Sequence, residues 1–169
     1  MPKIIENLRE QLLAEARLQI EERGYAETTV RSVARAVGVG VGTVYNYFES
    51  KEMLIASFVF ESWKKYLKYM SELPTDDARA LLFGIYTALR EFADENKKLF
   101  SDAAAAGMPT STWSERHKML RGQISSFISP ITEGDGFLAE FLAESLICWS
   151  VEGRDFNSLY PILEKSLKK

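Results

Sequence analysis

Apolar residues recur every three or four positions along most of the chain, a spacing typical of amphipathic helices. Glycine and proline interrupt the pattern at Gly24, Pro74, Gly107 and Pro130, where helices are expected to end. No stretch alternates apolar and polar residues for long enough to predict a strand. The pattern therefore predicts helices at residues 3–23, 41–48, 76–96, 99–106, 137–151 and 156–167, with others beginning near 29, near 50 and near either 111 or 114.

The clearest pattern lies between residues 28 and 54. Thr29 can cap a short helix whose apolar side is formed by residues at helical spacing: Val30, Val33, Ala34 and Val37. Gly38 can end that helix, because glycine adopts a left-handed backbone at the least cost. A second short helix fits residues 41–48, and Ser50 can cap a third. Two short helices joined at a glycine-marked turn predict a helix-turn-helix motif.

The second helix of such a motif enters the DNA major groove, where its first residues meet base edges. Val44 and Phe48 can pack inward, so the other residues of this helix are expected to face outward. Thr43 can hydrogen-bond a base or a phosphate, and Lys51 can share one phosphate with the free amides at the start of the next helix. The predicted DNA-binding residues are Thr29, Arg31, Val41, Gly42, Thr43, Tyr45, Asn46, Tyr47 and Lys51.

The run TTVRSVARAVGVGVGTVYNYFESKEML resembles the DNA-binding signature of the tetracycline-repressor (TetR) family of transcriptional regulators. Its most specific part is the combination Gly-Thr-x-Tyr-x-Tyr-Phe-x-Ser-Lys at residues 42–51. The chain departs from the family pattern at Gly40, usually Ser, and at Val41, often Lys. Ser32 stands where an acidic residue is common, so we expect the capping box of this helix to be incomplete. The resemblance implies a dimer with an effector pocket in its C-terminal helices.

The composition limits the ways in which the chain can bind a partner. The 169 residues carry a net charge of −3, and residues 1–51 hold seven basic and seven acidic residues. This neutral balance predicts weak non-specific DNA binding and a need for dimerisation. No apolar run is long enough to span a membrane and no signal sequence is evident, so the expected location is cytoplasmic. Cys148, the single cysteine, is expected to be a small core residue.

The last two predicted helices, 137–151 and 156–167, are unusually apolar. A helix that is apolar on nearly every side must be covered on more than one face. We therefore predict that both helices pack against their own copies in a two-fold, four-helix interface, as the family resemblance also implies. The alternative is one helix buried within a monomer. The predicted interface residues are Phe137, Leu138, Phe141, Leu142, Trp149, Leu159, Tyr160 and Leu163.

Aromatic side chains between Phe58 and Phe127 allow two interpretations. The simpler one is core packing. The other is an apolar cavity with a few polar anchors that binds a small effector, which the family resemblance implies. The candidate pocket residues are Trp63, Tyr66, Tyr86, Phe100, Trp113 and Phe127.

Enzymatic chemistry finds little support in the sequence. His117 is the only histidine and Cys148 the only cysteine, so no metal cluster of the usual spacing can be assembled. The glycines of residues 38–42 lack the lysine that a phosphate loop needs. We predict no enzymatic activity, no cofactor and no metal, and we expect His117 to be a surface or capping residue.

Together these patterns predict an all-α protein with an N-terminal three-helix helix-turn-helix module plus a C-terminal helical bundle used for ligand binding and dimerisation. The predicted domains are residues 1–50 and 51–169. The predicted function is a sequence-specific, DNA-binding transcriptional repressor. It would bind a palindromic double-stranded operator as a homodimer, be released by a small-molecule effector and have no membrane partner. The alternative is a ligand-binding or protein-interaction module that retains the helix-turn-helix as a scaffold.

Overall fold

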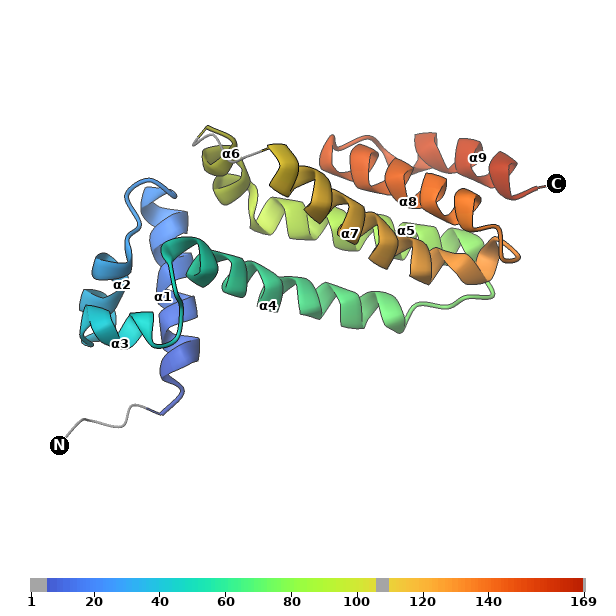
Figure 1. The fold of residues 1–169 in the computed structure, drawn as a ribbon. Coiled ribbons are helices and arrows are strands. Elements are labelled where there is room, and N and C mark those ends of the chain that lie inside the picture. The colour runs from blue at the N-terminus through green and yellow to red at the C-terminus, as the bar shows by residue number, and fades with distance from the viewer. Residues whose placement is uncertain (1–5, 106–109, 169) are drawn as a thin grey trace. The chain divides into compact units, whose positions relative to one another are not determined.

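The computed structural model describes residues 6–105 and 110–168, with the backbone alone described at 103–105 and 110–116. Every regular element within these residues is helical, which confirms the predicted all-α fold (Figure 1). The chain divides into two compact units, Met1–Trp63 with Asn96–Gly107 and Lys64–Glu95 with Met108–Lys169. The domains expected at residues 1–50 and 51–169 stay a prediction.

The first unit is built around a helix-turn-helix. The inward side of the first helix contributes to its core, and Val33, Val44 and Leu99 add buried apolar side chains from three other helices. Leu99 joins this core although it lies far along the sequence. The elements of the unit are α1 (Leu8–Arg23), α2 (Val30–Val37), α3 (Val41–Tyr45), the first part of α4 (Lys51–Ser71) and α6 (Lys97–Ala105).

Helix α3 is shorter than the predicted 41–48. The amides of both Tyr47 and Phe48 donate to the Val44 carbonyl, at 3.0 and 2.9 Å, so the chain tightens into a turn after Tyr45. Phe48 nevertheless reaches the core and is 4% exposed. The expected inward pair, Val44 and Phe48, is therefore confirmed although the helix ends earlier.

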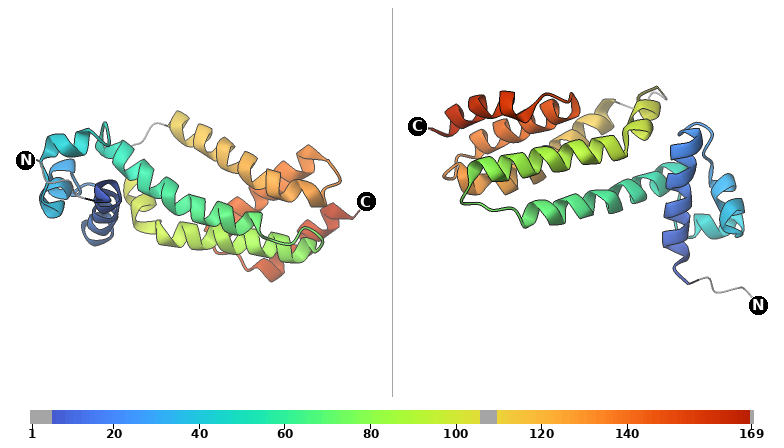
Figure 2. Two further views of the ribbon diagram at one scale, coloured as in Figure 1. Left: turned by 90° about the horizontal axis from the view of Figure 1, so that it is seen from below. Right: turned by 180° about the vertical axis from the view of Figure 1, so that it is seen from behind.

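The second unit is a helical bundle. Helix α8 packs against both α7 and α5, and the two views of Figure 2 show these helices side by side. Ile85 of α5, Ile124 of α7 and Leu142 of α8 are fully buried. Helix α9 lies against α5 and α8. The elements of the unit are the end of α4, α5 (Ala78–Glu95), α7 (Thr110–Ile128), the short 3-10 turn η1 (Ser129–Ile131), α8 (Gly136–Val151) and α9 (Phe156–Leu167).

Three residues predicted at the dimer interface are core residues of this unit. Leu142, Leu159 and Leu163 are 0, 6 and 1% exposed, so their own chain already covers them and their prediction as partner contacts was wrong. The inward side of α8 faces α5 and α7, which the apolar pattern alone could not distinguish from a partner-facing side.

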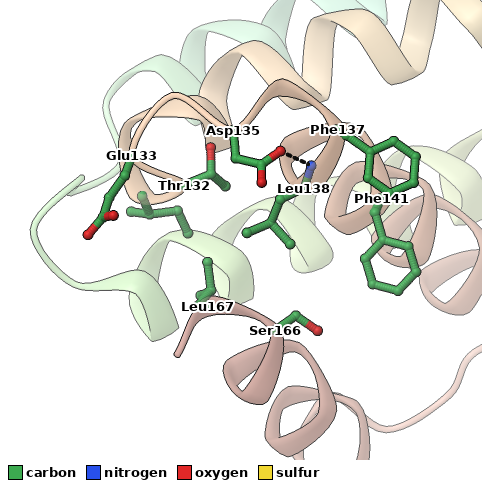
Figure 3. A pocket seen from close by; sticks show the side chains of 9 residues that line it. Thr132, Glu133, Asp135, Phe137, Leu138, Phe141, Ser166 and Leu167 are labelled. Atoms are coloured by element: carbon green, nitrogen blue, oxygen red, sulfur yellow. Dashed lines mark hydrogen bonds between the residues drawn. The ribbon is translucent and has the colours of Figure 1, made fainter. Parts of the chain in front are cut away.

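The other predicted interface residues retain exposed surface. Phe137 is 82% and Phe141 46% exposed, and both rings project from the same side of α8 (Figure 3). Leu138, Trp149 and Tyr160 are half-buried. Two exposed apolar residues were missed, Val151 on α8 and Ile162 on α9, at 63 and 62%. Beside Phe137, an open hollow of about 380 Å³ reaches Ser166 and Leu167 of α9.

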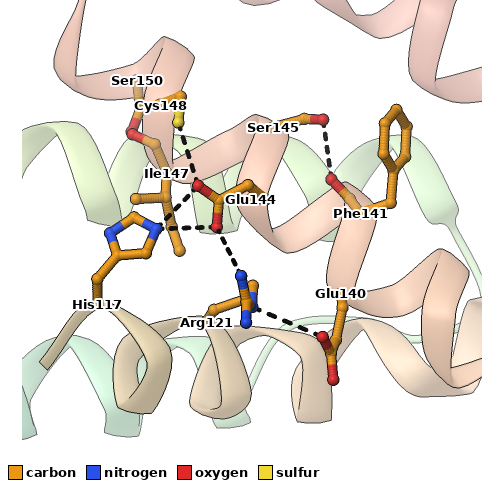
Figure 4. A network of polar contacts seen from close by, with 9 residues as sticks. All are labelled: His117, Arg121, Glu140, Phe141, Glu144, Ser145, Ile147, Cys148 and Ser150. Carbon is orange, nitrogen blue, oxygen red and sulfur yellow. Dashed lines mark hydrogen bonds and ion pairs between the residues drawn. The ribbon is translucent and has the colours of Figure 1, made fainter. Parts of the chain in front are cut away.

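Polar contacts join α7 to α8 on the surface of the same unit (Figure 4). His117 Nε2 lies 2.8 and 2.9 Å from the two carboxylate oxygens of Glu144. Arg121 approaches Glu140 and Glu144, each at 3.6 Å. Cys148 is exposed and its thiol donates to Glu144 at 3.4 Å, so the expectation of a core cysteine was wrong. His117 is half-exposed, as expected of a surface residue.

Candidate nucleic-acid interface

Helix α3 presents its predicted contact residues on the outer side of the first unit. Tyr45 and Tyr47 are 51 and 48% exposed, although tyrosine rings are usually well covered. Gly42 is exposed, and a Cβ added to it would meet nothing within 4 Å. The fold therefore does not require glycine at this position, which leaves the backbone open to close approach by a partner. Asn46 is also exposed, while Val41 and Thr43 are half-exposed.

The start of α2 is fixed by a capping box. The Thr29 hydroxyl accepts from the Ser32 amide, and the Ser32 hydroxyl accepts from the Thr29 amide, both at 3.0 Å. The expectation of an incomplete box was wrong, because the short Ser32 side chain performs the role that glutamate or glutamine usually takes. Arg31 lies in the same first turn and is exposed.

A surface hollow of about 530 Å³ lies where α2, α3 and α4 meet. The N-termini of α2 and α4 both border it, and the first amides of a helix lack partners within the helix. Such N-termini attract anions through these amides and through the helix dipole. The lining residues are Thr29, Val30, Arg31, Val41, Tyr45, Glu49, Ser50, Lys51 and Glu52.

Lys51 lines this hollow but is also bound within the protein. Its ammonium donates to the Tyr25 carbonyl and lies 3.9 Å from the centre of the Tyr25 ring. Desolvation by burial lowers the pKa of Lys51, and the charge of Glu52 partly offsets this effect. Lys51 thus ties the α1–α2 loop to the start of α4, a role that its sequence position did not reveal.

Tyr25 also hydrogen-bonds Glu52 of α4 and Asp102 of α6. Its hydroxyl donates to Glu52 at 3.1 Å, and burial together with Glu52 raises the pKa of Tyr25. The pKa of Glu52 is lowered, chiefly by its own backbone amide and by a hydrogen bond from Ser50. Burial opposes this shift, while the hydrogen bond from Tyr25 and the charge of Lys51 add to it. The Tyr25 amide donates to Asp102 of α6 at 2.9 Å.

Helix α6 holds the end of α1 in place. Lys98 donates to the carbonyls of Glu21 and Glu22, at 3.0 and 3.2 Å, which satisfies acceptors in the last turn of α1. Gly24 follows with a φ of 86°, and a Cβ there would lie 2.4 Å from Asp102 Oδ2. No local sequence pattern could predict this contact, because Asp102 lies 77 residues after Tyr25.

The helix-turn-helix and the elements around it match a known family. Residues 12–58 fit the family model described as bacterial regulatory proteins, tetR family. The regulator HbdR of Aromatoleum sp. (strain CIB) is 35% identical over 54 residues, which are 32% of this chain and 24% of that protein. The repressor KstR2 of Rhodococcus jostii (strain RHA1) is 33% identical over 90 residues, 51% of this chain and 43% of that protein. Residues 12–58 therefore carry a helix-turn-helix of the TetR type.

The similarity to solved structures extends beyond the motif. A transcriptional regulator from Rhodococcus sp. RHA1 superposes with a TM-score of 0.62 at 24% identity, over 95% of this chain and 91% of that chain. At this identity the superposition shows a common fold. The stretches matched in the two curated relatives span less than half of each relative's length.

The candidate effector residues divide between the two units. Trp63 is buried in the first unit, and Phe100 packs against the core of that unit. In the second unit Tyr66 and Tyr86 are buried and Phe127 is half-buried. The Tyr86 hydroxyl donates to the Arg154 carbonyl. The Trp113 side chain lies outside the described residues, and the pocket stays a prediction.

Neither a metal site nor a membrane span is found in the described part of the chain. Within it, no three His, Cys, Asp or Glu side chains are grouped so that they could hold a metal ion. None of the helices in residues 6–105 and 110–168 has both the length and the apolar character needed to cross a bilayer.

Proposed function

We propose that this chain is a DNA-binding transcriptional repressor that binds a palindromic operator as a homodimer and is released by a small-molecule effector. The observation that supports it best is the outward set on α3 beside the hollow at the N-termini of α2 and α4. Thr43 and Gly42 would meet base edges, while Tyr45, Tyr47 and Arg31 would contact phosphates.

The two tyrosine hydroxyls suit phosphate contact. Each belongs to a ring about half exposed, so a phosphate can reach the hydroxyl without displacing the core. Lys51 contributes charge at the hollow while its Tyr25 contacts hold it in place. Replacing Lys51 would therefore remove both a charge and a structural tie, which makes the tyrosines the clearer test.

The test begins with a gel-shift selection of bound duplexes from a library of short random DNA, which provides a probe. Phenylalanine at positions 45 and 47 should each weaken binding about threefold to tenfold, because one charge-assisted hydrogen bond to phosphate is lost. The matched control is Tyr69→Phe, another exposed tyrosine, at 46%, in α4. Equal binding by all three variants, or no selected duplex, would contradict the proposal.

A second candidate function is a ligand-binding or protein-interaction module that uses the helix-turn-helix as a scaffold. Glu49 and Glu52 favour it, because they line the same hollow as Lys51 and would repel phosphate. This function predicts that the random library yields no enriched duplex. Enrichment of a palindrome would exclude it.

Homodimerisation is part of the proposal and rests on the exposed apolar side chains of α8 and α9. Phe137, Phe141 and Ile162 are 82, 46 and 62% exposed, and a second copy packed on them would remove these side chains from water. Effector binding would release the operator by favouring a dimer with a different spacing of the two α3 helices.

A further inference from the structure

Gln19 of α1 is a polar side chain in the core of the first unit. It is 1% exposed, and a buried amide costs free energy unless both of its ends are hydrogen-bonded. Its Nε2 donates to Glu15 Oε1 at 2.7 Å, and its Oε1 accepts from the Ser32 hydroxyl. Both ends are therefore satisfied, one by α1 itself and the other by α2.

The orientation of this amide follows from Glu15. A carboxylate only accepts hydrogen bonds, so it must face the NH₂ group of Gln19 rather than the oxygen. The oxygen then faces Ser32. The Ser32 hydroxyl has a single proton, for which the Thr29 carbonyl at 2.8 Å is the competing acceptor.

The direction of the Ser32 proton affects the capping box. When the Ser32 hydroxyl donates its hydrogen bond to Gln19, a lone pair of its oxygen remains directed at the Thr29 amide, 3.0 Å away. The box then holds the first turn of α2 in one geometry, and Thr29 and Arg31 of that turn line the hollow. Gln19 has no exposed surface of its own with which to contact DNA.

We infer that Gln19 is a positioning residue for DNA binding, which orders the start of α2 for phosphate contact through Ser32 and Thr29. This inference rests on the proposed function. Hydrogen bonds run without interruption from Glu15 of α1 through the buried Gln19 to the capping box of Ser32 and Thr29.

The experiment measures affinity for the selected duplex, its salt dependence and thermal stability in the full chain. Gln19→Met keeps the length of the side chain and removes its polar atoms. It should lower affinity about threefold to tenfold, the loss expected when one hydrogen bond no longer orders the site. The slope of log affinity against log salt should become shallower by about one, because Arg31 in the disordered first turn would lose its phosphate contact.

A rescue and a control make the result specific. Ser32→Gln supplies a longer side chain that can accept from the Thr29 amide without help from Gln19. Added to Gln19→Met, it should restore both affinity and salt slope. The control is Gln11→Met, because Gln11 is exposed on the same helix and bonds only the Glu6 carbonyl, at 3.1 Å.

Several outcomes would overturn the inference. Wild-type affinity and salt slope in Gln19→Met would do so, and so would an affinity loss that follows thermal stability with no change in salt slope. If Gln19→Met fails to fold, Ser32→Ala removes the same hydrogen bond from a half-exposed position. Undiminished DNA binding by Ser32→Ala would then overturn the positioning role of Gln19. If the wild type itself selects no duplex, the proposed function fails first and this inference with it.

Discussion

Around α2 and α3, polar side chains are tied to neighbouring helices, whereas α8 and α9 leave large apolar side chains facing water. In the first region, Gln19 is bonded at both ends and Lys98 holds two carbonyls of α1. In the second, Phe137 and Ile162 are 82 and 62% exposed. The first region thus has polar side chains fixed by hydrogen bonds, and the second has apolar side chains exposed to water.

The difference indicates two kinds of partner. A surface that contacts a charged, hydrated partner gains affinity when its donors are ordered before binding, because less freedom is lost on association. An apolar surface gains mainly when another surface excludes water from it. Under the proposed function, the ordered donors of the first region would meet the DNA backbone, and the exposed apolar side chains of the second would meet a second copy.

The largest expected effect comes from placing charge on the apolar surface. Glutamate at both Phe137 and Phe141 should raise the dimer dissociation constant at least about a thousandfold, roughly 4 kcal/mol, because each aromatic anchor of an interface contributes about 2 kcal/mol. Light scattering over a range of concentrations measures the change. Tyr69→Glu is the control, an exposed aromatic on α4. A dimer that persists in the double variant would place the interface elsewhere.

The next effect tests whether the inner side of α8 belongs to the core of its own unit. Leu142→Ala should lower the free energy of unfolding by about 3 kcal/mol, because it leaves a cavity in a fully buried site. Urea unfolding measures it. Leu18→Ala, at a leucine 47% exposed on α1, should change stability by less than about 0.5 kcal/mol. Similar losses in both variants would mean that burial does not separate these positions.

Leu142 and Gln19 also show what the sequence could and could not predict. Helical spacing located the helices and the inward residues Val44 and Phe48, because these depend on local periodicity. It could not separate the two sides of α8, since Leu142 and Phe141 are both apolar and only tertiary packing decides which is covered. The roles of Asp102 and Gln19 depend on contacts with distant residues, for which a single sequence carries no signal.

A smaller effect tests the contact between α6 and the end of α1. Gly24→Ala should cost about 2 kcal/mol, because its φ of 86° is unfavourable for alanine and the new methyl would displace Asp102 from the Tyr25 amide. Gly38→Ala is the control, with a φ of 76° but nothing within 4 Å of the added Cβ. It should cost about 1 kcal/mol from backbone strain alone. Equal losses on thermal unfolding would show that the Asp102 contact contributes nothing.

The smallest effect concerns Cys148 on the outer side of α8. Burial raises the pKa of the Cys148 thiol first, and the hydrogen bond to Glu144 and its charge raise it further, with a contribution from Glu152. The thiolate is the form that reacts with alkylating reagents, so a raised pKa means slower reaction at a given pH. Glu144→Gln removes the negative charge and should shift the rise of the alkylation rate to lower pH.

The alkylation rate is measured in the variant with glutamate at positions 137 and 141, which is expected to be monomeric. Cys148 lies seven residues after Phe141, on the same side of α8, so a partner subunit would otherwise shield the thiol and mask the electrostatic effect. Iodoacetamide rates from pH 7 to 10, with unfolded protein as the reference, separate shielding from ionisation. If Glu144→Gln and its parent follow the same pH profile, Glu144 does not control the thiol. If wild-type Cys148 reacts as fast as in the monomeric variant, the outer side of α8 is not covered by a second copy.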